Sequence, residues 1–389
     1  MLNFTFYNPA KIYFGAGQEA KVGEYVAQYS QKILLHYGGG SIKKNGIYQK
    51  VVDSLRESGI TFVELGGAQP NPRLSLVRKG IQLCKEHGLN FILAVGGGSV
   101  IDSAKGVAVG VCGQEDIWDY YMGGSDRITQ ALPIGVVLTI PATGSESSPS
   151  SVITNEENHM KRSIATPHVI PQFAVLNPEF TDTLPPYQIA CGASDILSHL
   201  MERYFTQVEH VDFTDRLLEA SMRTILDNGV LALERPQDYH ARAEMMWVGT
   251  IAHNGLLNTG RIGDWASHHI EHELSGIYDI AHGAGLAIVT PAWMKYVCHT
   301  DMDRFVQFAI RVFDVSYPMA EKEIIVREGI LRLEAWYRRM GLPIRLSEVG
   351  IGRERFAEMA EKCMIGRSHE GNFQKLGQKD IVQIYELAL

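Results

Sequence analysis

Paired cysteines, long apolar runs and a basic charge excess are all missing from this chain of 389 residues. Its five cysteines are scattered with no CxxC pair, which argues against a disulfide framework and favours a reducing compartment. The most apolar segments, such as 91–95 and 134–140, are far too short to cross a bilayer, so we expect no membrane partner. The N-terminus lacks a basic region followed by an apolar run, so we expect no secretory signal and a cytoplasmic location. A formal net charge of −8 argues against nucleic acid as a partner, because phosphate binding needs a basic surface.

The length of the chain predicts about two domains, and its pattern changes near residue 180. Residues 1–180 alternate short β-branched runs with amphipathic helical stretches, which predicts a Rossmann-like α/β domain with a parallel sheet. Residues 181–389 read almost entirely as helices. The proline-rich tract 177–186 is typical of a linker. We therefore expect a dinucleotide-binding α/β domain over 1–180 and an all-helical domain over 181–389.

Three glycines follow a predicted strand in "AVGGGSVIDSAKG" (94–106) and lead into a helix. Glycines let the backbone approach an anion, and the helix N-terminus supplies oriented N–H groups. Gly97, Gly98 and Ser99 could therefore hold a pyrophosphate, while Asp102 could bond a ribose or the loop itself. A tight strand-to-helix turn without a ligand is the alternative, because this is not a GxGxxG motif.

A second loop, "LLHYGGGSIKKNG" (34–46), indicates which dinucleotide is bound. The corresponding strand of NAD-binding folds often ends at an acidic residue that bonds the adenosine ribose, but no Asp or Glu lies between residues 33 and 49. Small residues and nearby ammonium groups instead suit a 2′-phosphate, which favours NADP over NAD. These residues are Gly38, Gly39, Gly40, Ser41, Lys43 and Lys44. The alternative is that both lysines are solvated surface residues.

A third polar loop, "TIPATGSES" (139–147), offers Thr139, Thr143 and Ser145 as hydroxyl donors beside a strand end. Parallel sheets bind ligands at the carboxyl ends of their strands. The three loops therefore predict one ligand-binding edge, although this one could be an ordinary turn.

Histidines cluster in "GDWASHHIEHELSGIYDIAHG" (263–283), and a carboxylate and a further histidine lie four apart at Asp195 and His199. Residues four apart on a helix share one face. His268 and His272 have the same spacing, and His282 follows after a reversal of the chain. A carboxylate with several imidazoles suits Zn²⁺ or Fe²⁺. Each pair alone could equally be a surface hydrogen bond or a polar face, and spacing does not say which histidines ligate.

These motifs, together with "IYFG", "PNP" (70–72), "PATGSES" and "GASDILSHLMERY", resemble the iron-containing (group III, metal-dependent) alcohol dehydrogenases along nearly the whole chain. The sequence is most similar to the butanol dehydrogenase and NADPH-dependent aldehyde reductase branch. The resemblance implies a dehydroquinate synthase-like architecture, a homodimer, a dinucleotide cofactor, NADP or NAD, and one divalent metal, Fe²⁺ or Zn²⁺.

The resemblance also implies a role for particular residues. The metal ligands would be Asp195, His199, His268 and His282. His272 is then similar to the family's candidate proton-relay residue. The dinucleotide contacts would include Gly97, Gly98, Ser99, Asp102, Thr139 and Thr143. Gly39, Gly40 and Ser41 look like the version that accepts a 2′-phosphate, and Lys161 matches a basic position near the cofactor.

Two positions depart from the family pattern. Asn177 replaces a frequent Asp, at a position that we expect to be structural. Ala281 replaces a frequent proline before the last ligand, which could loosen the turn that carries His282.

The expected activity is interconversion of primary alcohols and aldehydes by hydride transfer, on small, butanol-like substrates. A glycerol dehydrogenase-like polyol oxidase that uses NAD is the alternative. A dehydroquinate synthase-like cyclase would need several basic residues around a phosphorylated substrate, and the 260–285 region offers only Arg261. A non-catalytic nucleotide- or metal-binding protein is disfavoured because the sequence carries complete sets of candidate residues for both a dinucleotide site and a metal site.

Overall fold

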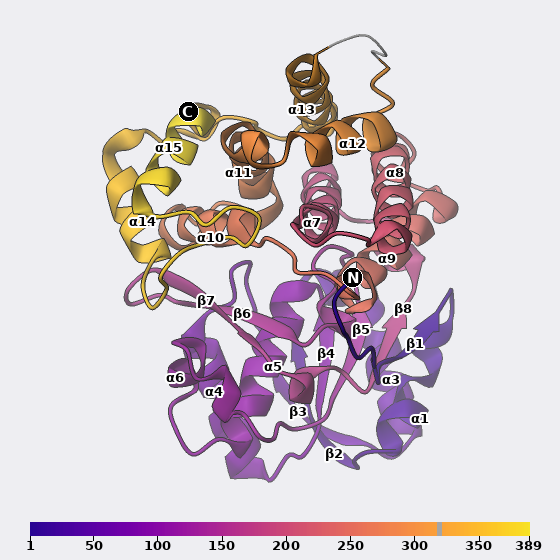
Figure 1. The fold of residues 1–389 in the computed structure, drawn as a ribbon. Helices are drawn as coiled ribbons and strands as arrows, with labels where there is room; N and C mark the ends of the chain where they lie inside the picture. The colour runs from indigo at the N-terminus through magenta and orange to yellow at the C-terminus, as the bar shows by residue number, and fades with distance from the viewer. Residues whose placement is uncertain (317–320) are drawn as a thin grey trace. The chain divides into compact units, whose positions relative to one another are not determined.

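A computed structural model describes residues 1–316 and 321–389. The chain forms two compact units (Figure 1). The α/β unit comprises Tyr7–Leu184 and Pro236–Asn254, and the helical unit comprises Met1–Phe6, Pro185–Arg235 and Gly255–Leu389. The main change from one unit to the other lies between Leu184 and Pro185, inside the tract expected to be a linker.

Six parallel strands form the central sheet of the α/β unit, in the order β1-β8-β5-β4-β2-β3. Parallel strands that are covered on both faces read as continuous apolar runs. The two central strands, "ILAVG" and "IGVVL", are buried at every position, which confirms the predicted parallel sheet. The strands are β1 (Lys11–Phe14), β2 (Lys32–Tyr37), β3 (Thr61–Leu65), β4 (Ile92–Gly96), β5 (Ile134–Leu138) and β8 (Phe173–Leu176).

Helices cover both faces of this sheet (Figure 1). Because side chains alternate along a strand, Ile92 and Ala94 of β4 join one core, and Leu93 and Val95 join the other. The first core includes α4 (Leu74–His87) and α5 (Gly98–Cys112), and the second includes α1 (Val22–Ala27) and α3 (Ile47–Glu57). The short helices α2 (Ser41–Lys44) and α6 (Ile117–Tyr121) complete the helices of residues 7–184.

Two features of the α/β unit differ from the sequence prediction. An antiparallel hairpin, β6 (Ser150–Asn155) and β7 (Met160–Ala165), follows the third polar loop. Helix α9 (Tyr239–His253) belongs to this unit, although the sequence pattern placed it in a helical domain. Its Met246 joins the α4–α5 core, and the Thr250 hydroxyl donates to the buried Glu146 carboxylate over 2.6 Å.

The described part of the helical unit is built from α-helices and short 3₁₀ turns. Helix α11 is buried from Gly283 to Met294 and forms the centre of its core. The helices are α7 (Pro186–Tyr204), α8 (Asp212–Glu234), α10 (Ala266–Tyr278), α11 (His282–Val297), α12 (Met302–Phe313), α13 (Lys322–Arg339), α14 (Phe356–Cys363) and α15 (Gln378–Ala388). None of the helices in the described residues is long and apolar enough to span a membrane.

Candidate metal centre and dinucleotide site

Helix α7 carries the first two predicted ligands on one face. Asp195 and His199 are four residues apart, so helical geometry brings them together, and His199 Nδ1 lies 3.7 Å from Asp195 Oδ1. Both residues are buried, with 3% and 4% of their surface exposed. A carboxylate held this far from water needs a compensating positive charge or hydrogen bonds.

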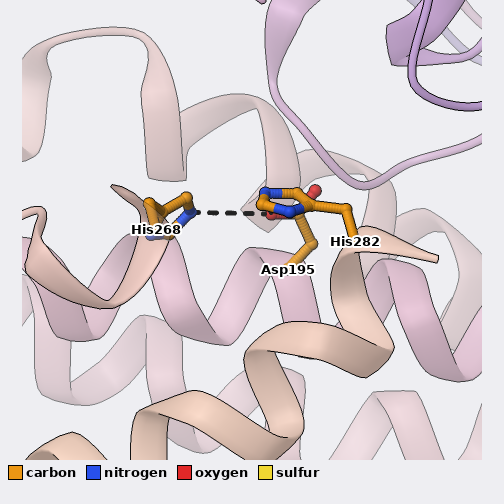
Figure 2. Close-up of side chains that lie close together, drawn as sticks. All are labelled: Asp195, His268 and His282. Carbon is orange, nitrogen blue, oxygen red and sulfur yellow. Dashed lines mark ion pairs between the residues drawn. The ribbon is translucent and has the colours of Figure 1, made fainter. Parts of the chain in front are cut away.

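Two further histidines reach the same carboxylate from other helices. His268 comes from the first turn of α10, and His282 is the first residue of α11. The Nε2 atom of each ring lies 3.8 Å from Asp195 Oδ1 (Figure 2). The three candidate ligand atoms all lie within 4.8 Å of one another. Ligands about 2.0–2.2 Å from a tetrahedral ion are separated by roughly 3.4 Å, so this spacing suits a shared cation.

The donor set also fits a divalent cation chemically. Asp195 Oδ1 and His268 Nε2 are buried, and neither has a hydrogen-bond partner among residues 1–316 and 321–389. Buried polar atoms are normally satisfied, so two unpartnered potential ligand atoms that face each other indicate a place for an ion between them. Burial lowers the pKa of His268, but Asp195 and Glu202 outweigh that effect and raise it to about 9.

His199 is placed differently from the other three predicted ligands. It presents Nδ1 to Asp195, and its ring stacks on that of His268, with centroids 4.7 Å apart and planes at 22°. Asp195, His268 and His282 therefore form one compact group of three, with His199 beside it. Glu271, His272 and His282 form a second such group, which shares His282 with the first.

The sequence spacing did not show which other histidines lie near the candidate ligands, and the structure places His272 and His269 differently. The His272 ring centroid is 5.6 Å from that of His282, which places this residue next to the candidate ligands. His269 instead hydrogen-bonds Glu370 through Nδ1 over 2.7 Å. This contact directs the His269 ring to Glu370 and not to the candidate ligand cluster.

Two buried carboxylates beside the cluster were missed by the sequence analysis. Glu202 contacts Nδ1 of His268 over 2.8 Å, and Glu271 contacts Nδ1 of His282. A signal for Glu202 was present, since Asp195, His199 and Glu202 have the i, i+4, i+7 spacing of one helical stripe.

The glycine loop after β4 forms the N-terminus of α5, as predicted. Gly97 is the N-cap of this helix, and its first N–H groups are those available to an anion. A Cβ atom on Gly98 would lie 2.4 Å from Cγ2 of Thr143, so Gly98 lets the third polar loop approach the first. Thr139 is buried at the end of β5, where its N–H donates to Gly96 O over 3.1 Å. Four of the predicted dinucleotide residues therefore lie at adjoining strand ends.

Asp102 holds the loops together. Its Oδ1 accepts the Ser145 hydroxyl over 2.6 Å, and its Oδ2 accepts the Val152 N–H over 3.0 Å. Burial raises the pKa of Asp102, while these hydrogen bonds and Lys105 oppose the rise. Of the two roles considered from the sequence, these contacts support the bond to the loop. Lys161, on β7, is buried and donates from Nζ to Asn71 over 3.1 Å.

The loop at 38–41 is exposed to solvent, and an acidic residue of the neighbouring strand β3 lies near the lysine that follows the loop. Gly39, Gly40 and Ser41 are exposed. Glu64 of β3 accepts the Tyr37 and Tyr48 hydroxyls over 2.6 Å each. Its Oε2 also lies 3.5 Å from Lys43 Nζ, which sits over both tyrosine rings. Partial burial raises the pKa of Glu64, but these partners outweigh it and lower the pKa. Residues 33–49 contain no acidic side chain, but the Glu64 carboxylate on β3 places a negative charge beside Lys43.

The two departures from the family pattern have structural explanations. Asn177 is fully buried, and its amide donates to Glu19 over 3.1 Å, next to Glu179. Aspartate would place a third carboxylate there, so Asn177 fits the structural role expected for it. Ala281 has φ −62°, the value that a proline would impose, so the backbone before His282 keeps that geometry without proline.

Comparisons with known proteins agree with the motifs. Two family models match the chain, iron-containing alcohol dehydrogenase over residues 9–178 and Fe-containing alcohol dehydrogenase family, C-terminal, over 189–389. The chain is 43% identical to the probable NADH-dependent butanol dehydrogenase 2 of Bacillus subtilis, covering 100% of both chains. It is 35% identical to the NADPH-dependent aldehyde reductase YqhD of Escherichia coli, covering 95% of this chain and 96% of that one.

A solved structure agrees with the fold. The crystal structure of NADH-dependent butanol dehydrogenase A from Thermotoga maritima is 42% identical in sequence and matches with a TM-score of 0.95. The match covers 100% of this chain and 99% of that one. The predicted combination of a parallel α/β domain and a helical domain is thereby confirmed.

Proposed function

The chain belongs to the iron-containing alcohol dehydrogenase family, and on that premise we propose that it interconverts primary alcohols and aldehydes with a nicotinamide dinucleotide and one divalent metal ion. The observation that carries the proposal is the meeting of Asp195, His268 and His282 around two unsatisfied buried atoms. The names of the butanol dehydrogenase and aldehyde reductase relatives support the substrate class. A glycerol-type polyol oxidase remains the alternative activity and has less support.

Asp195, His199, His268 and His282 would hold the metal, Fe²⁺ or Zn²⁺. When bound, such an ion supplies Lewis acidity toward a carbonyl or alkoxide oxygen. Three helices hold Asp195, His268 and His282 close together before binding, and Asp195 and His268 are buried. His199 must turn its ring to present Nε2, or ligate through the Nδ1 that it now directs to Asp195.

His272 is the proposed proton donor to the alcohol product. It is buried, with 7% of its surface exposed, and its ring lies beside that of His282. An imidazole can act as a general acid and as a general base, which the two directions of the reaction require. It is not required as a ligand in this assignment.

The dinucleotide would bind the α/β unit, with its pyrophosphate at Gly97, Gly98 and Ser99 and the N-terminus of α5. Thr139, Thr143 and Lys161 are proposed as further contacts. Asp102 would act by holding the loop, given its two hydrogen bonds to the protein. The cofactor supplies the hydride chemistry, and the residues fix its position.

A preference for NADP over NAD stays a prediction. The open, small-residue loop at 38–41 and the exposed Lys44 support it. The pairing of Lys43 with Glu64 and the NADH dependence in the name of the 43% identical relative favour NAD. The homodimer stays a prediction from the family resemblance, and the cytoplasmic location stays a prediction from the cysteine pattern and the N-terminal sequence.

The test is aldehyde-dependent oxidation of NADPH and of NADH by metal-stripped protein to which Fe²⁺ or Zn²⁺ is restored. We expect turnover only with the metal restored.

His268→Ala should abolish metal content and turnover together, because it removes a ligand. His272→Ala should keep its metal and turn over about 10²–10⁴-fold more slowly, the usual contribution of general acid catalysis. Loss of metal from the His272 variant would show that its role is assigned wrongly.

A further inference from the structure

Two candidate metal ligands, His268 and His282, each contact a carboxylate on the ligand-bearing helix that precedes their own. Glu202 of α7 contacts Nδ1 of His268 on α10 over 2.8 Å. Glu271 of α10 contacts Nδ1 of His282 on α11. Both carboxylates are buried, with 3% and 0% of their surface exposed. The pattern repeats from α7 to α10 and from α10 to α11.

Glu202 fixes the backbone and the ring of its partner at the same time. Its Oε1 accepts the His268 main-chain N–H over 3.0 Å as well as the ring Nδ1–H, and its Oε2 accepts the Trp265 N–H over 2.5 Å. The two main-chain N–H groups belong to the N-cap residue and the first turn of α10, where N–H groups have no partners within the helix. The Glu202 side chain therefore ties both the start of α10 and the His268 ring to α7, which carries Asp195.

Glu271 contacts its histidine without also binding main-chain N–H groups at the start of a helix. Its Oε1 accepts the Ser275 hydroxyl, its Oε2 accepts the His282 Nδ1–H, and the Ser275 hydroxyl also lies 3.2 Å from Ile280 O. The first turn of α11 leaves room for this carboxylate, since a Cβ atom on Gly285 would come 2.4 Å from Glu271 Oε1. The contact to His282 therefore orients an imidazole and does not serve to start a helix.

Ionised carboxylates only accept hydrogen bonds, so each Nδ1 must carry the ring proton. In the neutral ring that binds a metal, Nε2 then offers its lone pair, and in both rings Nε2 lies 3.8 Å from Asp195 Oδ1. Partners of this kind fix the tautomer and ring orientation of metal-bound imidazoles and strengthen them as ligands. We propose that Glu202 and Glu271 are positioning residues that preset His268 and His282 for metal binding. This inference rests on the proposed function, because it concerns the same metal centre.

Titration of metal-stripped protein with Co²⁺ alone tests the inference, with the visible absorption of the bound ion as the readout. We expect Glu202→Gln and Glu271→Gln to weaken Co²⁺ binding by about 10–100-fold and to shift the absorption bands, because a misoriented ring changes the ligand field. Glu219→Gln is the matched control. Glu219 is also buried in the helical unit, but it bonds Tyr204 and Arg311. Its variant should bind Co²⁺ like the wild type.

Ser275→Ala is a milder variant for the case that a glutamine variant fails to fold. It removes one donor to Glu271 and leaves the carboxylate in place, so we expect a loss of a few-fold in Co²⁺ affinity. Wild-type affinity and spectrum in the folded Glu→Gln variants, or in Ser275→Ala if these do not fold, would overturn the inference. Lower thermal stability with unchanged Co²⁺ affinity would do so as well. Wild-type protein that binds no Co²⁺ would instead count against the proposed function itself.

Discussion

Glu64 shows how a single residue can change the expected cofactor preference. Its carboxylate lies 3.5 Å from Lys43 Nζ, beside the loop expected to meet a 2′-phosphate. Removing this charge by Glu64→Gln leaves the ammonium of Lys43 uncompensated and removes a repulsive charge. We expect the ratio of kcat/KM for NADPH to that for NADH to rise roughly three- to tenfold, or about 0.6–1.4 kcal/mol.

The matched control for this variant is Glu57→Gln, an exposed glutamate on α3. It should leave the NADPH-to-NADH ratio unchanged. The effect of Glu64→Gln should also shrink at high salt, because charges at an exposed site are screened. A ratio that stays constant, or moves toward NADH, would show that Glu64 does not influence dinucleotide choice.

His36 predicts a dependence of stability on pH. It lies fully buried in β2, with Nδ1 2.8 Å from Leu65 O, and burial lowers its pKa from 6.5 to about 4, although this hydrogen bond partly opposes the shift. The unfolded chain takes up the proton first as the pH falls. The free energy of unfolding should therefore drop between pH 6.5 and 4, by about 3 kcal/mol in total.

Urea unfolding at pH 7 and pH 4.5 measures this effect. His36→Leu should lack this part of the pH dependence, whatever its stability at pH 7. His87→Leu, at an exposed site on α4, should keep the wild-type dependence. Identical pH dependence in the wild type and the His36 variant would contradict the prediction.

Among the contacts between helices, the close approach of α11 to α7 requires a glycine at position 283. A Cβ atom on Gly283 would lie 2.0 Å from the main-chain oxygen of Cys191, which cannot move away as a side chain can. Gly283→Ala should force α11 from α7 and displace His282. We expect a loss of at least 1–3 kcal/mol in stability together with weaker metal binding.

Gly229→Ala, on α8, provides the comparison. Its Cβ atom would come 3.2 Å from Cβ of Ala193, a tight contact with a side-chain atom. This variant should lose less stability and bind metal normally in the Co²⁺ titration. Wild-type stability of the Gly283 variant in thermal unfolding would show that the two helices separate more easily than their close approach implies.

Sequence patterns predicted most helices and strands and part of the candidate site. The physical basis was the burial of strands in the first case and the periodicity of helices in the second. Continuous apolar runs predicted the buried strands, and the four-residue spacing of Asp195 and His199 predicted their shared face. Glu64 was out of reach because its pairing with Lys43 arises between neighbouring strands. The assignment of α9 was equally hidden, since its amphipathic pattern does not say which core it joins.

Metal binding should stabilise one unit of the whole molecule selectively. All candidate ligands and both positioning carboxylates belong to the helical unit. A ligand at about 100 times its Kd adds about 2.7 kcal/mol to the stability of the state that binds it. Hydrogen exchange with and without Zn²⁺ should therefore show added protection in α7, α10 and α11, and little change in β2, β4 and β5. Added protection of the sheet alone would place the metal elsewhere.

The membership of α9 in the α/β unit has a consequence for how the protein is made. A nascent chain that has reached Leu184 still lacks Met246 in the core and the Thr250 hydroxyl on the buried Glu146 carboxylate. The dinucleotide fold is therefore completed only when residue 254 has left the ribosomal exit tunnel. His268 and His282 emerge later still, so the α/β unit proposed to receive the dinucleotide can mature before the proposed cation site exists.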